Sequence, residues 1–550
     1  KAARDAGLKF WETNPKVDYL IGRKLSQKYR FAEGSEFQRR ALEFDRTYLP
    51  AKIQLAQDLM RLGHEEEGFR HASEVFQADQ YDVSAYNLVT LHDTMSKYTV
   101  LTNEHFVLRM SDEEARVYGQ QALDLLNRAR ARLTEKYGVE LEVPTIVEIF
   151  PKQKDFAVRT FGMPGGDGYL GVCFGNVITA NSPATHTMNW HSVLWHEFCH
   201  VVTLNLTKNK MPRWLSEGIS VYEERRASVR WGEQINPQYR EMIKGGEMKP
   251  ISDLSAAFMA PPSGLHLQFA YYQSSLVVEF LIERFGPESI RAILKDLGDG
   301  KKINDALVAH TAPMDQLEKD FVAFAEGVAD HMGADSVWEQ PKDGIDPVWA
   351  ATHSENFWVI RRKADQLLDE QKFDEAIPLL EELIAIYPSQ SGGDSAYALL
   401  AEIHRRDKNA EEERKILDAW VKLDGEAIDA LLRLIELDFA AGDTEAALRH
   451  AQILLEIDPL QPAPHRAIAE AEEEKGNDTA AIRSLRTVLA LDPPNPSRVH
   501  FRLARLLHKT GGENAKRHLL RALEESPRYR DAHALFLQIA EAEPGLIEAK

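Results

Sequence analysis

Apolar residues recur every three or four positions along most of the chain, which is the spacing of amphipathic helices. Residues 1–97 and 355–550 keep this helical spacing. The pattern changes in between, where residues 99–110 alternate between apolar and polar and residues 144–150 read as a short, buried apolar run. Segments of these two kinds predict β-strands. The chain is therefore predicted to be mainly helical, with a small sheet near its middle.

The two helical flanks also repeat themselves. In the first flank, Gly34 and Gly68 are 34 residues apart, as are Ala51 and Ala85. In the second flank, an alanine lies twelve residues before each proline that closes an apolar helix, in the pairs Ala376–Pro388, Ala447–Pro459, Ala481–Pro493 and Ala515–Pro527. A 34-residue period with small residues at helix contacts resembles the tetratricopeptide repeat, a helix–turn–helix unit. The resemblance implies stacked units that form a superhelix with a concave face.

The central segment, between the two helical flanks, combines a predicted helix with predicted strands. A helix is predicted from Asp112 to Tyr137, and two short strands are predicted after a glycine-rich turn, at 169–175 and 177–181. These patterns divide the chain into N-terminal repeats at 1–97, a central domain at 98–333, a linker at 334–354 and C-terminal repeats at 355–550.

The most informative stretch of the central domain reads W-H-S-V-L-W-H-E-F-C-H-V-V-T-L-N-L, at residues 190–206. Its apolar residues predict a buried helix. Residues four apart lie on one face of a helix, so the imidazoles of His196 and His200 can bind one zinc ion. Glu197 can reach a metal-bound water without binding the metal. A second predicted helix begins near Pro212 and carries Glu217, which is the natural third ligand of a zinc site that keeps one position open.

The two helices together resemble those of the gluzincins, the metallopeptidases whose third ligand is a glutamate on the helix after the H-E-x-x-H helix. The match rests on His196, Glu197 and His200, and on W-L-S-E-G at 214–218. The metzincin alternative is excluded, because Thr203 and Leu206 stand where that class has glycine and histidine. The resemblance implies one zinc ion per chain, with Glu197 as the general base that activates the zinc-bound water.

The resemblance extends to residues around the predicted site. It implies a tyrosine on a later helix that stabilises the oxyanion, and Tyr271 matches it, with Tyr272 and His266 as competitors. Glu224 lies seven residues after Glu217 on the same helix face, where it either orients a ligand histidine or is a solvated surface residue.

The family's edge strand binds extended substrate backbone, a role for which residues 169–175 are the candidate, although an interior strand fits the pattern equally well. Exopeptidases of the aminopeptidase branch of the gluzincins bind the substrate's free amine with a glutamate on that strand. The corresponding G-Y-L-G-V-C-F-G-N, at 168–176, contains no acidic residue, so an endopeptidase is favoured.

Composition and charge bear on the kind of partner and on the location of the chain. The formal net charge of −20 argues against a nucleic-acid partner, and no apolar run has the length of a membrane span. The two cysteines, Cys173 and Cys199, make no disulfide framework, so redox chemistry does not fix the compartment. The first residue is Lys1 rather than methionine, and both a cytoplasmic and a periplasmic or other extracytoplasmic location stay open.

Two functions are consistent with these patterns. In the first, the chain is a zinc metallopeptidase that hydrolyses polypeptides, and its repeats bind substrate or partner proteins in their concave groove. In the second, it is a catalytically inactive repeat scaffold with a structural or vestigial zinc site. The first is favoured, because the general base and the open metal position are both retained, whereas a structural zinc site has four protein ligands.

Overall fold

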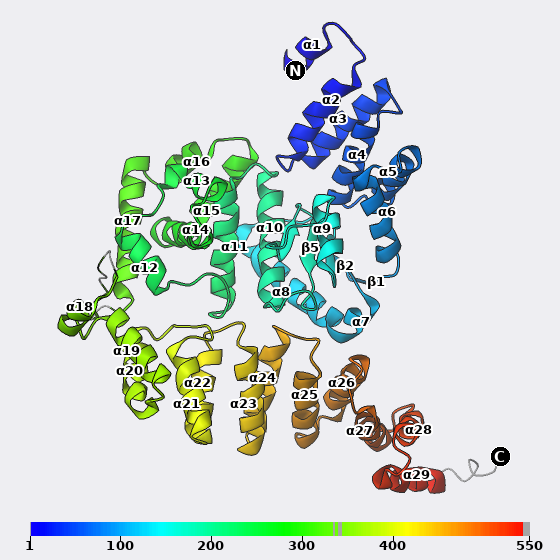
Figure 1. Ribbon diagram of the computed structural model, residues 1–550. Helices are drawn as coiled ribbons and strands as arrows, with labels where there is room; N and C mark the ends of the chain where they lie inside the picture. The colour runs from blue at the N-terminus through cyan, green and yellow to red at the C-terminus, as the bar shows by residue number, and fades with distance from the viewer. Residues whose placement is uncertain (1, 334–335, 339–340, 342–343, 543–550) are drawn as a thin grey trace. The chain divides into compact units, whose positions relative to one another are not determined.

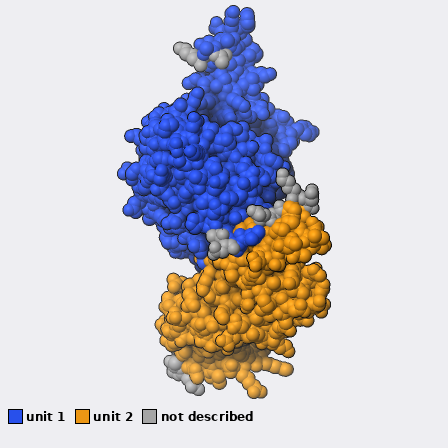
Figure 2. Space-filling view, turned by 90° about the vertical axis from the view of Figure 1, so that its left-hand side faces the viewer, with its two compact units in different colours: residues 1–112, 119–186, 190–337 blue, residues 113–118, 187–189, 338–550 orange. Residues whose placement is uncertain are grey.

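A computed structural model of the chain describes residues 2–333, 336–338, 341 and 344–542. The structure is mainly helical with one small sheet (Figure 1). Its internal contacts divide it into two compact units (Figure 2). The first unit contains residues 1–112, 119–186 and 190–337, and the second contains residues 113–118, 187–189 and 338–550.

The first unit begins with helices that pack as antiparallel neighbours. They are α1 (Ala2–Leu8), α2 (Pro15–Ser26), α3 (Phe31–Phe44), α4 (Leu49–Arg61), α5 (Glu65–Ala78) and α6 (Val83–Met95). Small residues are required where α2 meets α3: a Cβ atom on Gly22 would lie 2.8 Å from the carbonyl oxygen of Gly34. The glycine that marks the 34-residue period in the sequence is therefore a point of close helix approach.

A five-stranded sheet follows, with strand order β1-β2-β3-β5-β4. The strands are β1 (Thr99–Thr102), β2 (Phe106–Met110), β3 (Thr145–Phe150), β4 (Gly171–Cys173) and β5 (Val177–Asn181). The alternating stretch at 99–110 forms a hairpin of two strands, because Asn103 turns the chain between them. Strands β2, β3 and β5 run parallel, and β4 pairs antiparallel with β5. β4 is an edge strand, as one of the two sequence interpretations has it.

The first helices and the sheet share one hydrophobic core. Its buried residues come from the helices (Phe31, Ala56, Met60, Phe69, Ala72, Leu88, Leu91, Met95), from β3, β4 and β5 and the residue after β4 (Phe150, Val172, Phe174, Val177), and from α9 (Phe156, Val158). α9 (Gln153–Phe161), between β3 and β4, is a helix that the sequence pattern did not predict. The domain boundary at residue 97 stays a prediction, but no gap in packing separates the described residues on its two sides.

The remaining helices of the first unit include α10 (Trp190–Thr207), which carries H-E-x-x-H. The others are α8 (Gln120–Tyr137), α11 (Arg213–Ala227), α12 (Pro237–Lys244), α13 (Ala256–Met259), α14 (Gly264–Phe285), α15 (Pro287–Gly298), α16 (Ile303–His310) and α17 (Met314–His331). α10 contacts α8, α11, α15, β4 and β5, which explains why its sequence is apolar on nearly every face. α8 follows a short helix, α7 (Asp112–Glu114), and a π-helical turn at Ala115–Gly119.

The second unit is a series of paired helices, each packed on the next. They are α19 (Phe357–Asp369), α20 (Phe373–Ile386), α21 (Ala396–Arg406), α22 (Ala410–Val421), α23 (Ile428–Ala440), α24 (Thr444–Leu455), α25 (Pro462–Glu474), α26 (Asp478–Ala490), α27 (Pro496–Lys509), α28 (Ala515–Glu525) and α29 (Arg530–Ala542). The predicted linker lies partly outside the described residues, and its end forms α18 (Pro347–Thr352). Among the described residues of both units, no helix combines the length and the apolar character needed to cross a membrane.

Candidate metal centre

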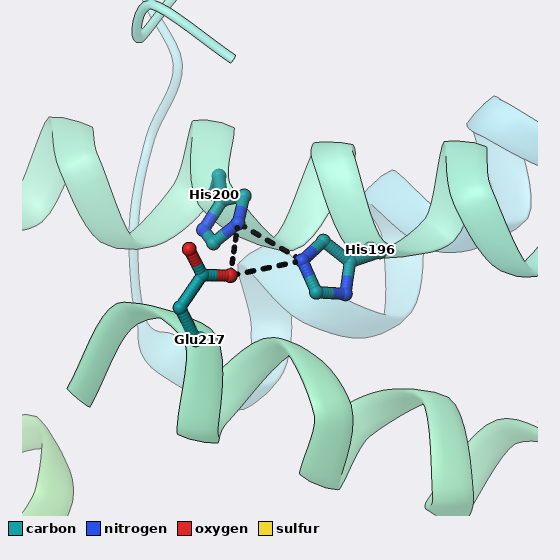
Figure 3. Close-up of side chains that lie close together, drawn as sticks. All are labelled: His196, His200 and Glu217. Atoms are coloured by element: carbon teal, nitrogen blue, oxygen red, sulfur yellow. Dashed lines mark hydrogen bonds and ion pairs between the residues drawn. The ribbon is translucent and has the colours of Figure 1, made fainter. Parts of the chain in front are cut away.

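Helices α10 and α11 bring three potential metal ligands together. Nε2 of His196 lies 3.1 Å from Nε2 of His200, and Oε2 of Glu217 lies 3.3 Å from the first and 3.4 Å from the second. Figure 3 shows the three side chains pointing toward one another from the two helices. Their side chains keep 18%, 11% and 14% of their surface exposed, in the order His196, His200 and Glu217, so the ligand atoms remain accessible. The three predicted ligands are thus neighbours in space.

The distances among these atoms fit a tetrahedral zinc ion. Bonds of about 2.0–2.1 Å at tetrahedral angles place ligand atoms roughly 3.3 Å apart. The imidazole nitrogens that face each other can each carry a lone pair, because the other nitrogen of each ring has an oxygen partner. The separation of 3.1 Å suits either a proton shared by the two nitrogens or a metal cation that both bind. The donor set of two nitrogens and one carboxylate oxygen is therefore suited to zinc.

The histidines are oriented by residues of α11 and of α10 itself. Nδ1 of His196 contacts Oε1 of Glu224, whose other oxygen accepts a hydrogen bond from Ser192 at 2.9 Å. Glu224 is 7% exposed and lies where an orienting partner is expected, rather than in solvent. Nδ1 of His200 lies 2.9 Å from the hydroxyl of Ser216 and 3.2 Å from that of Ser220. These contacts leave both Nε2 atoms directed at Glu217.

The serines were not singled out by the sequence pattern. Ser216 precedes Glu217 by one residue and Ser220 follows it by three, which places both on the side of α11 that meets α10. Burial would raise the pKa of Glu217, but hydrogen bonds and charge from His196 and His200 hold that pKa well below its usual value. In its ionised form the carboxylate can bind a cation.

Glu197 lies under the edge strand of the sheet. It is 5% exposed, and its buried Oε2 has no hydrogen-bond partner among the described residues. A Cβ atom on Gly171 of β4 would lie 2.7 Å from Oε1 of this carboxylate, so only glycine allows the strand to pass here. Burial raises the pKa of Glu197, and the neighbouring His200 and His196 counteract that increase. A buried carboxylate with an unused oxygen is suited to receive a proton from water.

Tyr271 approaches the centre from α14. Its hydroxyl accepts a hydrogen bond of 2.9 Å from Nη2 of Arg213, whose Nε donates to Oε1 of Glu217 at 3.2 Å. Burial raises the pKa of Tyr271 to about 12, and the charge of Glu217 adds to this effect. The approach depends on Gly218, since a Cβ atom there would lie 2.6 Å from the carbonyl oxygen of Ser274 on α14. Gly218, the glycine of W-L-S-E-G, is therefore needed to bring α14 close to α11.

The two competitors of Tyr271 lie elsewhere. The ring of Tyr272 is fully buried and stacks on Tyr239 with ring centroids 5.2 Å apart. His266 lies in the first turn of α14, where it contacts Ser263 at 2.8 Å and Glu247 at 3.3 Å. Of the three candidates, Tyr271 is the one whose hydroxyl contacts Arg213, which in turn contacts Glu217. The cysteines are both free thiols, and both are buried.

Comparison with known proteins gives independent support for the two parts of the chain. Residues 126–327 match the Peptidase MA superfamily, and residues 361–428 and 432–496 match the tetratricopeptide repeat. No curated protein matches the chain significantly.

Several solved structures match the chain at low identity and low TM-score. MamA protein is 15% identical, over 32% of this chain and 94% of its own, with a TM-score of 0.25. YrrB, described as a TPR protein with an unusual peptide-binding site, is 16% identical over 34% and 94%, with a TM-score of 0.27. Yeast Tom70 is 11% identical over 96% and 95%, with a TM-score of 0.22.

The matched peptidase segment contains α10, α11 and α14, and with them all three ligand side chains, Glu197 and Tyr271. The repeat matches fall within α19–α27 of the second unit. The chain therefore carries a Peptidase MA superfamily domain, followed by tetratricopeptide repeats.

Proposed function

We propose that the chain is a zinc-dependent metallopeptidase of the gluzincin type, an endopeptidase whose repeats bind substrate or partner proteins. One observation carries the proposal: three ligand atoms suited to zinc converge beside Glu197, whose buried Oε2 has no hydrogen-bond partner among the described residues. A site with three protein ligands leaves one metal position for water, as a hydrolytic centre requires. The match to the Peptidase MA superfamily supports a hydrolytic role.

Each side chain then has a defined task. His196, His200 and Glu217 would hold the zinc ion, which when bound lowers the pKa of water and polarises a carbonyl group. Glu197 accepts the proton of the attacking water and transfers it to the leaving amine. Tyr271 is neutral below a pKa of about 12, so its hydroxyl can donate a hydrogen bond to the carbonyl oxygen as negative charge develops there.

The edge strand supports binding of extended polypeptide. β4 has a free edge in the sheet order and passes directly over Glu197, so backbone paired with β4 lies next to the proposed base. The segment at 168–176 has no carboxylate to hold a free amino terminus, which favours an endopeptidase. Tetratricopeptide units in the second unit favour a polypeptide as partner, since stacked repeats present a concave surface.

The decisive test is Glu197→Gln. This variant should retain one zinc ion per chain and the melting temperature of the wild type, and it should lose at least 10²-fold in kcat because the amide cannot accept a proton. Glu247→Gln, which changes a half-exposed carboxylate outside the ligand set, is the matched control. Zinc content would be measured by elemental analysis, and turnover with an unbiased peptide library. A zinc-loaded Glu197→Gln variant that cleaves peptides at the wild-type rate would contradict the proposal.

Tyr271 is tested with its neighbour as the control. Tyr271→Phe should lower kcat by about 10²-fold with little change in KM, because the lost hydrogen bond acts on the developing oxyanion. Tyr272→Phe should leave kcat within about twofold, because that ring stacks on Tyr239 in the core. The opposite result would assign the role to Tyr272.

A further inference from the structure

The turn between α2 and α3 contains a residue in an unusual conformation. Tyr29 has a φ angle of 60°, in the left-handed region that bulky side chains rarely occupy. The backbone is held there by hydrogen bonds from Tyr29 N to Ser26 O at 3.0 Å and from Arg30 N to Leu25 O at 3.1 Å. Such strain persists only where surrounding contacts fix it.

Aromatic contacts attach the Tyr29 ring to the end of the edge strand. Its centroid lies 5.3 Å from that of Phe31 and 6.1 Å from that of Phe174, the residue after β4. The guanidinium of Arg61 lies over Phe31 and Phe174, at 5.3 and 5.7 Å. Tyr29 is thus fixed against the strand, although it belongs to the first helical pair of the chain.

The Tyr29 ring lies beside the end of the strand that passes over Glu197, because the ring contacts Phe174, and Gly171 of the same strand contacts Glu197. Burial is the main cause that raises the pKa of Tyr29 to about 12, and the charge of Arg61 opposes it. The side chain nevertheless keeps 41% of its surface exposed. A partly exposed ring beside the strand that passes over the proposed base is placed as the wall of a substrate site would be.

The direction of β4 shows which part of a substrate would meet this wall. Gly171 crosses Glu197, and the strand continues through Cys173 toward Phe174 and Tyr29. Antiparallel pairing is the commoner and more stable arrangement. A peptide paired antiparallel with β4 runs in the opposite direction, so the residues before its scissile bond lie on the Tyr29 side.

We propose that Tyr29 is a specificity-determining residue, whose ring packs against an apolar side chain two or three positions before the scissile bond. The proposal rests on the proposed peptidase function, and it assigns part of substrate recognition to the N-terminal helices rather than to the matched peptidase segment. The ring offers an apolar face for contact. The neighbouring Phe31 and Phe174 are already buried and support that face from behind.

The test compares Tyr29→Gly, Tyr29→Phe and Tyr81→Ala with the wild-type full chain. Glycine accepts the left-handed turn, so Tyr29→Gly removes the ring without adding backbone strain. Tyr81→Ala is the matched control, because Tyr81 is a 93% exposed tyrosine in another turn of the same helices. A peptide library read by mass spectrometry gives the residue preference on each side of the cut.

The wild type, Tyr29→Phe and Tyr81→Ala should prefer leucine over glycine at the second or third position before the cut by about tenfold, and Tyr29→Gly should abolish that preference. Binding provides a second measurement without turnover. Two labelled peptides from the best-cleaved sequence, with leucine or glycine at that position, are titrated into Glu197→Gln with and without Tyr29→Gly. The leucine peptide alone should bind more weakly, by about tenfold, when the ring is absent.

Two failures can be told apart. Cleavage by the wild type with an unchanged preference in Tyr29→Gly, or a change confined to positions after the cut, would overturn the role of Tyr29 alone. Absence of cleavage by the zinc-loaded wild type would overturn the proposed peptidase function, and this inference with it.

Discussion

Paired helices occur in both the N-terminal and the C-terminal region, but they form different kinds of hydrophobic core. The helices α2–α6 bury their apolar faces in a core that also takes residues from β3, β4, β5 and α9. The C-terminal array instead builds cores from its own successive helices, within residues 401–467, 469–515 and 501–539. Helical pairs thus share a core with the sheet in the N-terminal region, whereas in the C-terminal array they pack on one another.

Ion pairs connect different kinds of element in the two regions. Glu148 on β3 is fully buried between Arg159 on α9, at 2.7 Å, and Arg109 on β2, at 3.2 Å. Glu65 on α5 contacts both arginines, which ties the N-terminal helices to the sheet. The ion pairs of the C-terminal array connect its own helices, as Arg433 on α23 does with Glu413 on α22. Both Glu148 and Arg159 are fully buried, whereas Arg433 is 28% exposed, so the buried pair of the first unit should be the more sensitive to substitution.

The largest difference in stability between the two regions is expected when one paired arginine is replaced in each. Arg159→Met leaves the buried Glu148 with one partner fewer and should lower the free energy of unfolding of the first unit by about 3–5 kcal/mol. Arg521→Met on α28 should cost at most about 1 kcal/mol, because Arg521 and its partner Glu524 are 59% and 61% exposed and solvent replaces the lost pair. Urea unfolding of both variants measures the difference. Equal losses would show that the two regions do not differ in this respect.

Two leucine substitutions compare the cores directly. Leu88 on α6 and Leu434 on α23 are 1% and 0% exposed, so replacing either by alanine should cost about 3 kcal/mol. Leu88→Ala should also lower the temperature at which bound zinc is released, because its core includes the strands beside α10. Leu434→Ala should leave that temperature unchanged while it lowers the unfolding transition of the second unit. Zinc release followed with a chromogenic chelator during heating distinguishes them.

A pH effect is expected in the N-terminal helices. Burial raises the pKa of Asp58 to about 6, although Ser26, Arg61 and Gln54 favour its ionised form. Because the ordinary pKa of an aspartate is near 3.8, the unfolded state ionises first, so the contribution of Asp58 to stability is largest below about pH 4 and is lost by about pH 6. The shift of about two pH units corresponds to a loss of about 3 kcal/mol over this range. Asp58→Asn should flatten this part of the stability profile, measured by urea titrations from pH 4 to pH 7; an unchanged slope would place its origin elsewhere.

The smallest effect is expected for short peptides when the C-terminal array is removed. If the array recruits polypeptides, deletion from residue 355 onward should raise KM for a protein substrate and leave kcat/KM for a short peptide within about twofold, because only the local concentration changes. The melting temperature and zinc content of the first unit are the controls. Equal losses on both substrates would refute recruitment and indicate a structural role for the array.

Local patterns in the sequence determined several features of the protein. Positions four apart on one predicted helix placed His196 and His200 together, and W-L-S-E-G supplied Glu217 on the next helix. The 34-residue period indicated the C-terminal repeats that the family comparison confirms. These features depend on helix periodicity and on spacings of a few residues, which are visible along a single chain.

Tertiary packing decided the rest. Tyr271 was one of three candidates until the close approach of α14 to Gly218 placed its hydroxyl beside Arg213, and Glu224 was either a surface residue or a partner of His196. Neither α9 nor the shared core of α2–α6 and the sheet was predicted, and the edge position of β4 was one of two alternatives. Such contacts join residues far apart along the chain. Their geometry follows from how whole helices and strands pack, so no local pattern encodes it.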